Sequence, residues 1–101
     1  MNVKFLPAAE QDLGDIFLYI TDNLKNPIAA RNITTKILQR TQALENFPEI
    51  GVELSIIDPR FSNYHYLVVD NYLVIYNVAD AEVRIVRILY ARSDYMQLLR
   101  G

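Results

Sequence analysis

Apolar side chains in the first half of the chain recur at the spacing of α-helices. Between Ala9 and Leu24 they stand three or four positions apart, which predicts an amphipathic helix that begins near Pro7. Residues 23–27, ending in a proline, break this pattern, and a second helix is expected over residues 28–46. Because the connection is short, the two helices are expected to form an antiparallel hairpin.

The second half of the chain has the alternating pattern of β-strands. Three strands are predicted over residues 64–70, 72–78 and 82–90, with a tight turn at Asp70 and Asn71 between the first two. A further short strand is expected at residues 2–6, where Val3 and Phe5 alternate with polar residues, and one short helix at residues 93–99, with Ser93 as its N-cap.

The order strand, helix, helix, strand, strand, strand predicts an α+β fold. Helices that precede a run of strands favour one antiparallel sheet with the helical hairpin packed on one face. At 101 residues the chain is expected to form a single domain, residues 1–101, around one core. The second face of the sheet is then left for something other than the hairpin.

Composition narrows the class of protein. The chain is 51% hydrophobic and 22% charged, which is typical of a globular domain. It has no cysteine, which excludes disulfides and thiolate metal sites. No apolar run approaches the roughly 20 residues of a membrane span, and the start has no signal-peptide pattern, so a cytoplasmic protein is expected.

Charge is distributed unevenly along the chain. The net charge is −2, yet residues 24–44 carry four cations and no acid, and residues 83–101 carry four arginines against Asp94. A protein dedicated to binding double-stranded DNA would be more basic overall. Binding of a local anionic target by one of the two basic segments is left open as an alternative.

The last strand combines aliphatic and cationic side chains. Alternation places every second residue on the same face. The more apolar set, expected to face the helices, is Val83, Ile85, Arg87 and Leu89. The set expected on the uncovered face is Arg84, Val86, Ile88, Tyr90 and Arg92. Such a mixed strip suits a polyanion or a partner segment better than bulk water.

Four segments in this order resemble the RelE/ParE superfamily, the toxins of bacterial type II toxin–antitoxin modules. They are FLPAAEQDLGDIFLYITDN, LENFPEIG, YLVVDNYLVIYNV and VRIVRILYARSDY, and together they run almost from end to end. The resemblance implies a helical hairpin against an antiparallel sheet, in agreement with the pattern above. It also implies a small cognate antitoxin that wraps around the toxin as its partner.

The resemblance leaves three functions open. RelE-like toxins enter the ribosomal A site and cut mRNA without a metal or other cofactor, so ribosome and mRNA would be partners and the chain would be an endoribonuclease, an mRNA interferase. This is the first expectation. ParE-like toxins have a similar fold and poison DNA gyrase. An inactive module that only binds its antitoxin is the third reading.

Candidate site residues follow from the resemblance. Arg92 and Tyr90 stand at the end of the last strand, where RelE-like enzymes place functional groups, and Tyr95 and His65 could serve as further catalytic groups. The cations that could contact substrate are Arg84, Arg60 and Arg87. For the histidine a structural role is the alternative, for Arg84 a solvated edge charge, and for Arg87 an ion pair with Asp12 or Asp15.

The sequence departs from the nuclease pattern on its middle strands. Residues 64–70 and 72–78 carry no lysine or arginine, where RelE-type enzymes gather cations. Tyr72-Leu73-Val74 replaces the family's Tyr-Arg-Val, and Ser93 follows Arg92 where another arginine is common. The nuclease hypothesis therefore depends on few residues, and whether the chain is an enzyme stays open.

Overall fold

The structure, a computed structural model, describes residues 1–91. The predicted tail helix, with Ser93, lies outside them. The main elements are β1 (Asn2–Phe5), α1 (Pro7–Leu18), α2 (Pro27–Gln42), β3 (Tyr64–Val69), β4 (Tyr72–Ala79) and β5 (Glu82–Tyr90). Shorter ones are the π-helix η1 (Tyr19–Asn23), the 3-10 helices η2 (Ala43–Glu45), η3 (Leu54–Ile56) and η4 (Pro59–Phe61), and β2 (Val52–Glu53).

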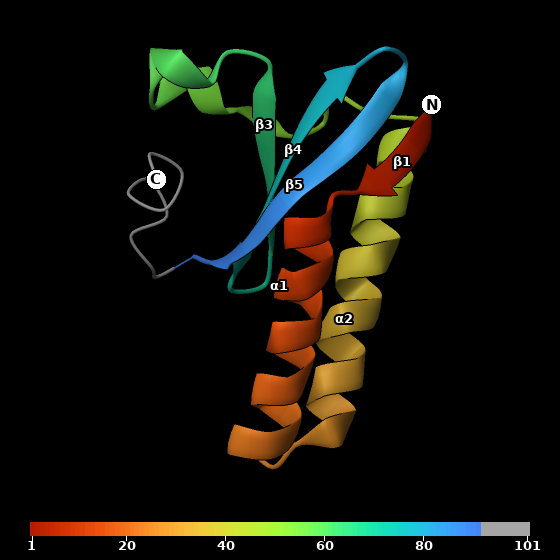
Figure 1. Cartoon of the computed structure of the whole chain (residues 1–101), viewed down its shortest axis with the longest axis vertical. Helices are drawn as coiled ribbons and strands as arrows, with labels where there is room; N and C mark the ends of the chain where they lie inside the picture. Colours follow the sequence, from red (N-terminus) through yellow and green to blue (C-terminus); the bar gives the residue numbers. More distant parts are fainter. Residues whose placement is uncertain (92–101) are drawn as a thin grey trace.

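The predicted α+β fold is confirmed, with a mixed sheet. Its strand order is β1-β5-β4-β3-β2. The last four strands are antiparallel to their neighbours, whereas β1 pairs with β5 in parallel. The helices lie side by side along the same side of the sheet (Figure 1). The β4–β5 hairpin turns on Asp80 and Ala81, which both have positive φ, as a two-residue type I′ turn requires.

The helical hairpin begins and ends where the sequence signals stand. Pro7 opens α1 at a position where a missing N–H costs nothing, and Pro27 does the same for α2. The side chain of Asn26 caps α2 by accepting a 3.0 Å hydrogen bond from the backbone N–H of Ala29. No helix within residues 1–91 has the length and apolar character that a membrane crossing needs.

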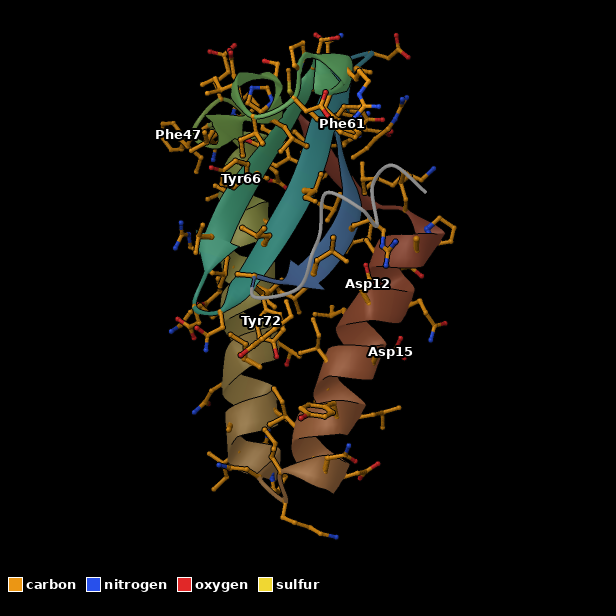
Figure 2. The ribbon with its side chains drawn as sticks, turned by 90° about the vertical axis from the view of Figure 1, so that its left-hand side faces the viewer. Asp12, Asp15, Phe47, Phe61, Tyr66 and Tyr72 are labelled. Carbon is orange, nitrogen blue, oxygen red and sulfur yellow. The ribbon has the colours of Figure 1, made fainter. Side chains whose placement is uncertain are left out.

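The main core lies between the hairpin and the sheet. Its buried members from the second helix are Ala30, Ile33 and Ile37, and those from the sheet are Leu67, Val69, Val74, Tyr76, Val83, Ile85 and Ile88. A second, smaller cluster consists of Leu54, Ile75 and Leu89, packed against Phe61, Tyr64, Tyr66 and Val86 (Phe61 and Tyr66 are labelled in Figure 2). The chain's own segment at residues 52–61 therefore covers part of the face that the sequence pattern left open (Figure 1).

A β-bulge in β5 corrects the predicted facing of this strand. Ile75 of β4 pairs with Arg87 while the next residue, Tyr76, pairs with Ile85, so Val86 is an extra residue. One extra residue inverts every later position. Facing is as predicted up to Val86, which packs against the second cluster, and wrong from Ile88 onward. Three residues are displaced: Ile88 joins the helix-side core, Leu89 packs on the opposite face, and Tyr90 lines a cleft against the helices.

Candidate functional site

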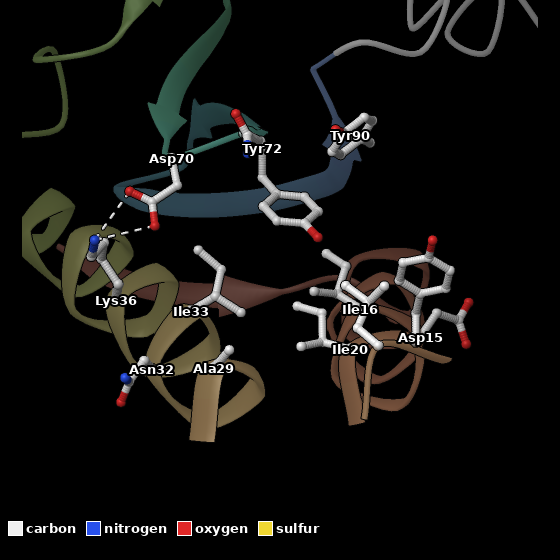
Figure 3. Close-up of a pocket in the computed structure, with 13 residues that line it drawn as sticks. Asp15, Ile16, Ile20, Ala29, Asn32, Ile33, Lys36, Asp70, Tyr72 and Tyr90 are labelled. Atoms are coloured by element: carbon white, nitrogen blue, oxygen red, sulfur yellow. Dashed lines mark hydrogen bonds and ion pairs between the residues drawn. The ribbon is translucent and has the colours of Figure 1, made fainter. Parts of the chain in front are cut away.

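A cleft of about 800 Å³ opens between the far half of the helical hairpin and the adjacent end of the sheet (Figure 3). Its apolar floor comes from both helical segments: Ile16, Ile20, Ala29 and Ile33. Tyr72 of β4 and Tyr90 of β5 overhang this floor from the sheet. Helical spacing brings the isoleucines to one face, and the β3–β4 turn closes the cleft beside them.

Two tyrosine rings form the sheet side of the cleft. Tyr72 and Tyr90 are opposite each other in the β4–β5 ladder, and their rings meet edge to face with centroids 5.7 Å apart. The Tyr72 hydroxyl points toward the isoleucine floor (Figure 3). Burial raises the pKa of Tyr72, and the nearby phenols of Tyr90 and Tyr19 raise it further. The Tyr90 side chain stays 41% exposed and is open to a partner.

The charged groups of the cleft stand at its two ends (Figure 3). At one end Lys36 Nζ binds both carboxylate oxygens of Asp70, at 3.0 and 3.1 Å. At the other end the exposed carboxylate of Asp15 accepts one hydrogen bond from Gln11, at 2.9 Å. Within residues 1–91 no cation pairs with Asp15. Counting residues 1–91 alone, the cleft has one uncompensated negative charge.

Arg87 is bound by Asp12, one of the two partners that the sequence suggested. Its Nε and Nη2 donate to the two carboxylate oxygens at 2.7 and 3.0 Å. The same carboxylate accepts the backbone N–H of Ile88 at 2.9 Å. This hydrogen bond to Asp12 raises the pKa of Arg87, so its positive charge is held in a structural pair.

The other two candidate arginines are also bound by acids. Arg84 donates to Glu82 at 2.9 Å and to Asp80 at 3.5 Å, close to the β4–β5 turn. Arg60 binds the buried Asp58 through its Nε and Nη2 atoms. In both cases the hydrogen bond to the carboxylate raises the pKa of the arginine. A phosphate would have to compete with these carboxylates for either guanidinium.

His65 has the surroundings of a structural residue. Its ring stacks on Tyr76, with centroids 5.3 Å apart and planes 18° from parallel. The Tyr76 hydroxyl is itself engaged, since it donates to the carbonyl of Pro48 and accepts from the N–H of Gly51. His65 Nδ1 is buried and has no hydrogen-bond partner among residues 1–91. Of the two ring nitrogens, Nδ1 is therefore shielded by the fold.

The candidate site residues that can be located do not come together. Tyr90 pairs with Tyr72 and His65 with Tyr76, four positions further along β4, or about 13 Å at strand spacing. Arg84 stands six residues before Tyr90 on the same strand, about 20 Å away. Arg92 and Tyr95 lie outside the described residues. Within residues 1–91 no group of His, Asp and Glu is arranged to hold a metal.

Two parts of the cleft were not assigned to a site from the sequence. They are Tyr72 and Tyr19, neither of which is among the site residues predicted from the sequence. The signal that could have marked them is Tyr19 standing four positions after Asp15, on the same helical face. Placing that face under the end of the sheet, however, requires the tertiary structure.

Comparison with known proteins identifies the family of this chain. Residues 3–95 match the family model described as the ParE toxin of the type II toxin–antitoxin system parDE. The chain belongs to the ParE toxin family. It is therefore the toxin of a type II toxin–antitoxin module, and membership implies a cognate antitoxin as its partner. The superfamily resemblance drawn from the sequence is confirmed.

Solved structures of ParE-type proteins share the fold. One titled "Chromosomal ParDE TA system from P. aeruginosa" has a TM-score of 0.76 at 20% identity, over 91% of this chain and 97% of that one. A "YoeB/ParE toxin from Agrobacterium tumefaciens" has a TM-score of 0.62 at 13% identity, over 89% and 98%. No curated protein matches the sequence. At these identities the two structures support the fold alone.

Proposed function

We propose that this ParE-family toxin arrests bacterial growth by binding DNA gyrase. The observation that carries the proposal is the state of the candidate nuclease groups. Arg60, Arg84 and Arg87 are each held by a carboxylate, and His65 is packed against Tyr76. Inhibition by binding asks for no catalytic group on the toxin, so it is compatible with all of these contacts.

Metal-free RNA cleavage has stricter requirements. It needs a group that activates the 2′-hydroxyl, cations that stabilise the charge on the phosphorane, and an acid for the leaving oxygen. These groups must converge within hydrogen-bond reach of one phosphate. Tyr90 and His65 stand about 13 Å apart along the sheet, which is too far for both to serve one phosphate.

Cleavage of mRNA on the ribosome is the second candidate, and one observation favours it. Tyr90 is 41% exposed at the end of β5, so part of this residue is accessible to a ligand. Arg92 and Tyr95 follow it in the sequence, and the three together would provide a phenol, a cation and a second phenol. A nuclease of this kind would depend on those three residues and not on the arginines of β5.

The experiment that separates the two functions measures replication and translation in the same cells. On induction without the antitoxin, we expect DNA synthesis to stop first and the SOS response to appear, while mRNA stays intact. In vitro, the purified toxin should inhibit gyrase supercoiling, and Arg92→Ala and Tyr90→Phe variants should leave translated mRNA as uncut as the wild type does. Cuts in translated mRNA that disappear in Arg92→Ala would overturn the gyrase proposal.

A further inference from the structure

We propose that two copies of this chain associate face to face through the outer side of their helical hairpins, around Gly14, with Glu10 of each copy paired with Arg31 of the other. The surface is a groove between α1 and α2 that shares no residue with the Tyr72–Tyr90 cleft. Its occupant is a second copy of the chain, so the inference goes beyond the proposed function.

The groove is an apolar depression of about 620 Å³ on the side of the hairpin that faces away from the sheet. Asp12, which binds β5, lies about 200° around α1 from both Glu10 and Gly14. Three large side chains that line the groove are exposed to solvent, Phe17 at 39%, Leu18 at 56% and Leu38 at 46%. Contiguous exposed apolar surface of this kind marks sites of protein association.

Nothing within residues 1–91 requires a glycine at position 14. Gly14 lies inside α1, and a Cβ added there would meet nothing within 4 Å among the described residues. Glycine weakens a helix interior relative to alanine, because it loses more conformational freedom on folding. On an exposed helical face it also lowers the surface, which lets another helix approach more closely. The glycine is therefore explained by a neighbour from outside the chain.

The charges at the two ends of the groove are self-complementary. Glu10 lines the groove near the start of α1. Arg31 stands near the start of α2, on the helical stripe of Thr34 and Leu38, and therefore at the opposite end of the hairpin. Both side chains are exposed, and neither forms an ion pair within residues 1–91.

A second copy fits this arrangement because a two-fold axis pairs the same surface with itself. When the axis lies in the interface midway between Glu10 and Arg31, each Glu10 meets the Arg31 of the other copy. One dimer then gains two ion pairs, and the exposed apolar side chains of the two hairpins cover one another around Gly14. A different protein would need both charges in the matching order.

The test measures self-association of the purified toxin by sedimentation velocity over a range of concentrations. We expect a monomer–dimer equilibrium with a dissociation constant of about 10 µM, as suits a small interface. Gly14→Gln fills the middle of the groove with a good helix former, so it should stay monomeric while its thermal stability is at least that of the wild-type monomer.

Charge exchange makes the pairing specific. Glu10→Arg and Arg31→Glu each replace two attractive pairs by two repulsive ones, and each should weaken the dimer about tenfold. A mixture of these two variants restores both ion pairs and should form a heterodimer with nearly wild-type affinity. Arg40→Glu is the matched control, since it makes the same change half a turn around α2 from Arg31, and it should dimerise like the wild type.

Two results would overturn the proposal. One is a wild type that stays monomeric at about 100 µM, ten times the expected constant; loss of gyrase inhibition in Gly14→Gln would then assign the groove to the target instead. The other is a mixture of Glu10→Arg and Arg31→Glu, both folded by circular dichroism, that associates no better than either alone. Because self-association is measured on the toxin by itself, a negative gyrase assay would leave it unaffected.

Discussion

At the scale of single residues, Tyr76 makes two hydrogen bonds that a single substitution would remove. Its side chain is fully buried in the main core, and its hydroxyl bridges Pro48 O at 2.8 Å and Gly51 N at 3.0 Å. A Cβ on Gly51 would stand 2.5 Å from this hydroxyl, so only glycine fits there. Tyr76 therefore fixes the segment that follows α2 to the middle of the sheet.

Removing this hydroxyl should destabilise the fold while leaving the ring in place. Tyr76→Phe leaves the N–H of Gly51 and the carbonyl of Pro48 without their partner, and we expect a loss of about 2 kcal/mol in the free energy of unfolding. Urea unfolding measures it. Tyr66→Phe is the control, since its hydroxyl makes no such bridge to any of residues 1–91, and it should stay within about 0.5 kcal/mol of the wild type. Equal losses in the two variants would contradict the assignment.

The same tyrosine predicts how stability depends on alkaline pH. Burial raises the pKa of Tyr76 above its ordinary value of 10.0, so the unfolded chain releases this proton first. Its contribution is therefore fully present below pH 10 and is lost as pH rises through the folded-state pKa. Urea unfolding from about pH 8 to about pH 11 should show falling stability. Tyr76→Phe should show a smaller fall, and an identical fall would contradict the prediction.

At the scale of elements, the hydrogen bonds between α1 and β5 satisfy the edge of β5 that β1 leaves unpaired. β1 pairs with β5 only as far as Phe5 and Ile85, and beyond them the edge is covered by a side chain from α1. Asp12 accepts the N–H of Ile88 and both donors of Arg87. Where the pairing with β1 has ended, the Asp12 carboxylate accepts a backbone hydrogen bond from β5, immediately after the bulge.

Asp12→Asn should measurably weaken the contact between α1 and β5. Asparagine keeps one acceptor but loses the charge, so Arg87 is left with an unpaired guanidinium that is only 33% exposed. We expect a loss of about 2 kcal/mol in the free energy of unfolding, reduced from the value of a fully buried pair by solvent contact. Asp15→Asn on the same helix is the control and should change stability little. A double-mutant cycle with Arg87→Ala would give no coupling if the pair contributed nothing.

The elements themselves could be predicted, because their hydrophobic periods are strong and their boundaries are marked by proline and asparagine. The facing of β5 beyond Val86 could not be predicted. Nothing in the run VRIVRILY distinguishes a bulge at Val86 from a regular strand, since its valines, isoleucines and tyrosine all favour strands and no glycine or proline interrupts it. The two-residue strand β2 and the 3-10 helices η3 and η4 are too short to show a periodic pattern of apolar residues.

The candidate site was harder to predict than the fold. The ion pair between Arg87 and Asp12 could be anticipated, since a lone arginine on a helix-facing position needs an acid. The cleft could not, because Ile16, Ile33 and Tyr72 come from three elements whose spacing depends on tertiary packing. His65 illustrates the opposite error: residue type suggested chemistry, whereas its stacking on Tyr76 gives it a structural role.

At the scale of the whole molecule, the charge balance bears on the target. The chain has a net charge of −2, and within residues 1–91 both arginines of β5 are bound by acids. Affinity for a nucleic acid backbone grows with the number of cations free to replace its counterions. Among residues 1–91 the sheet offers few such cations, although the second helix carries cations of its own.

The small number of free cations on the sheet predicts weak binding to RNA in the absence of a ribosome. At physiological salt, we expect a dissociation constant for single-stranded RNA weaker than about 10⁻⁴ M, the lower end of non-specific binding. Fluorescence anisotropy of a labelled oligonucleotide measures it at several salt concentrations. A variant with Glu82→Gln and Asp80→Asn releases Arg84 from its partners and should bind RNA more tightly and with a steeper salt dependence. Tight binding by the wild type would contradict this view of the charges and favour the nuclease reading.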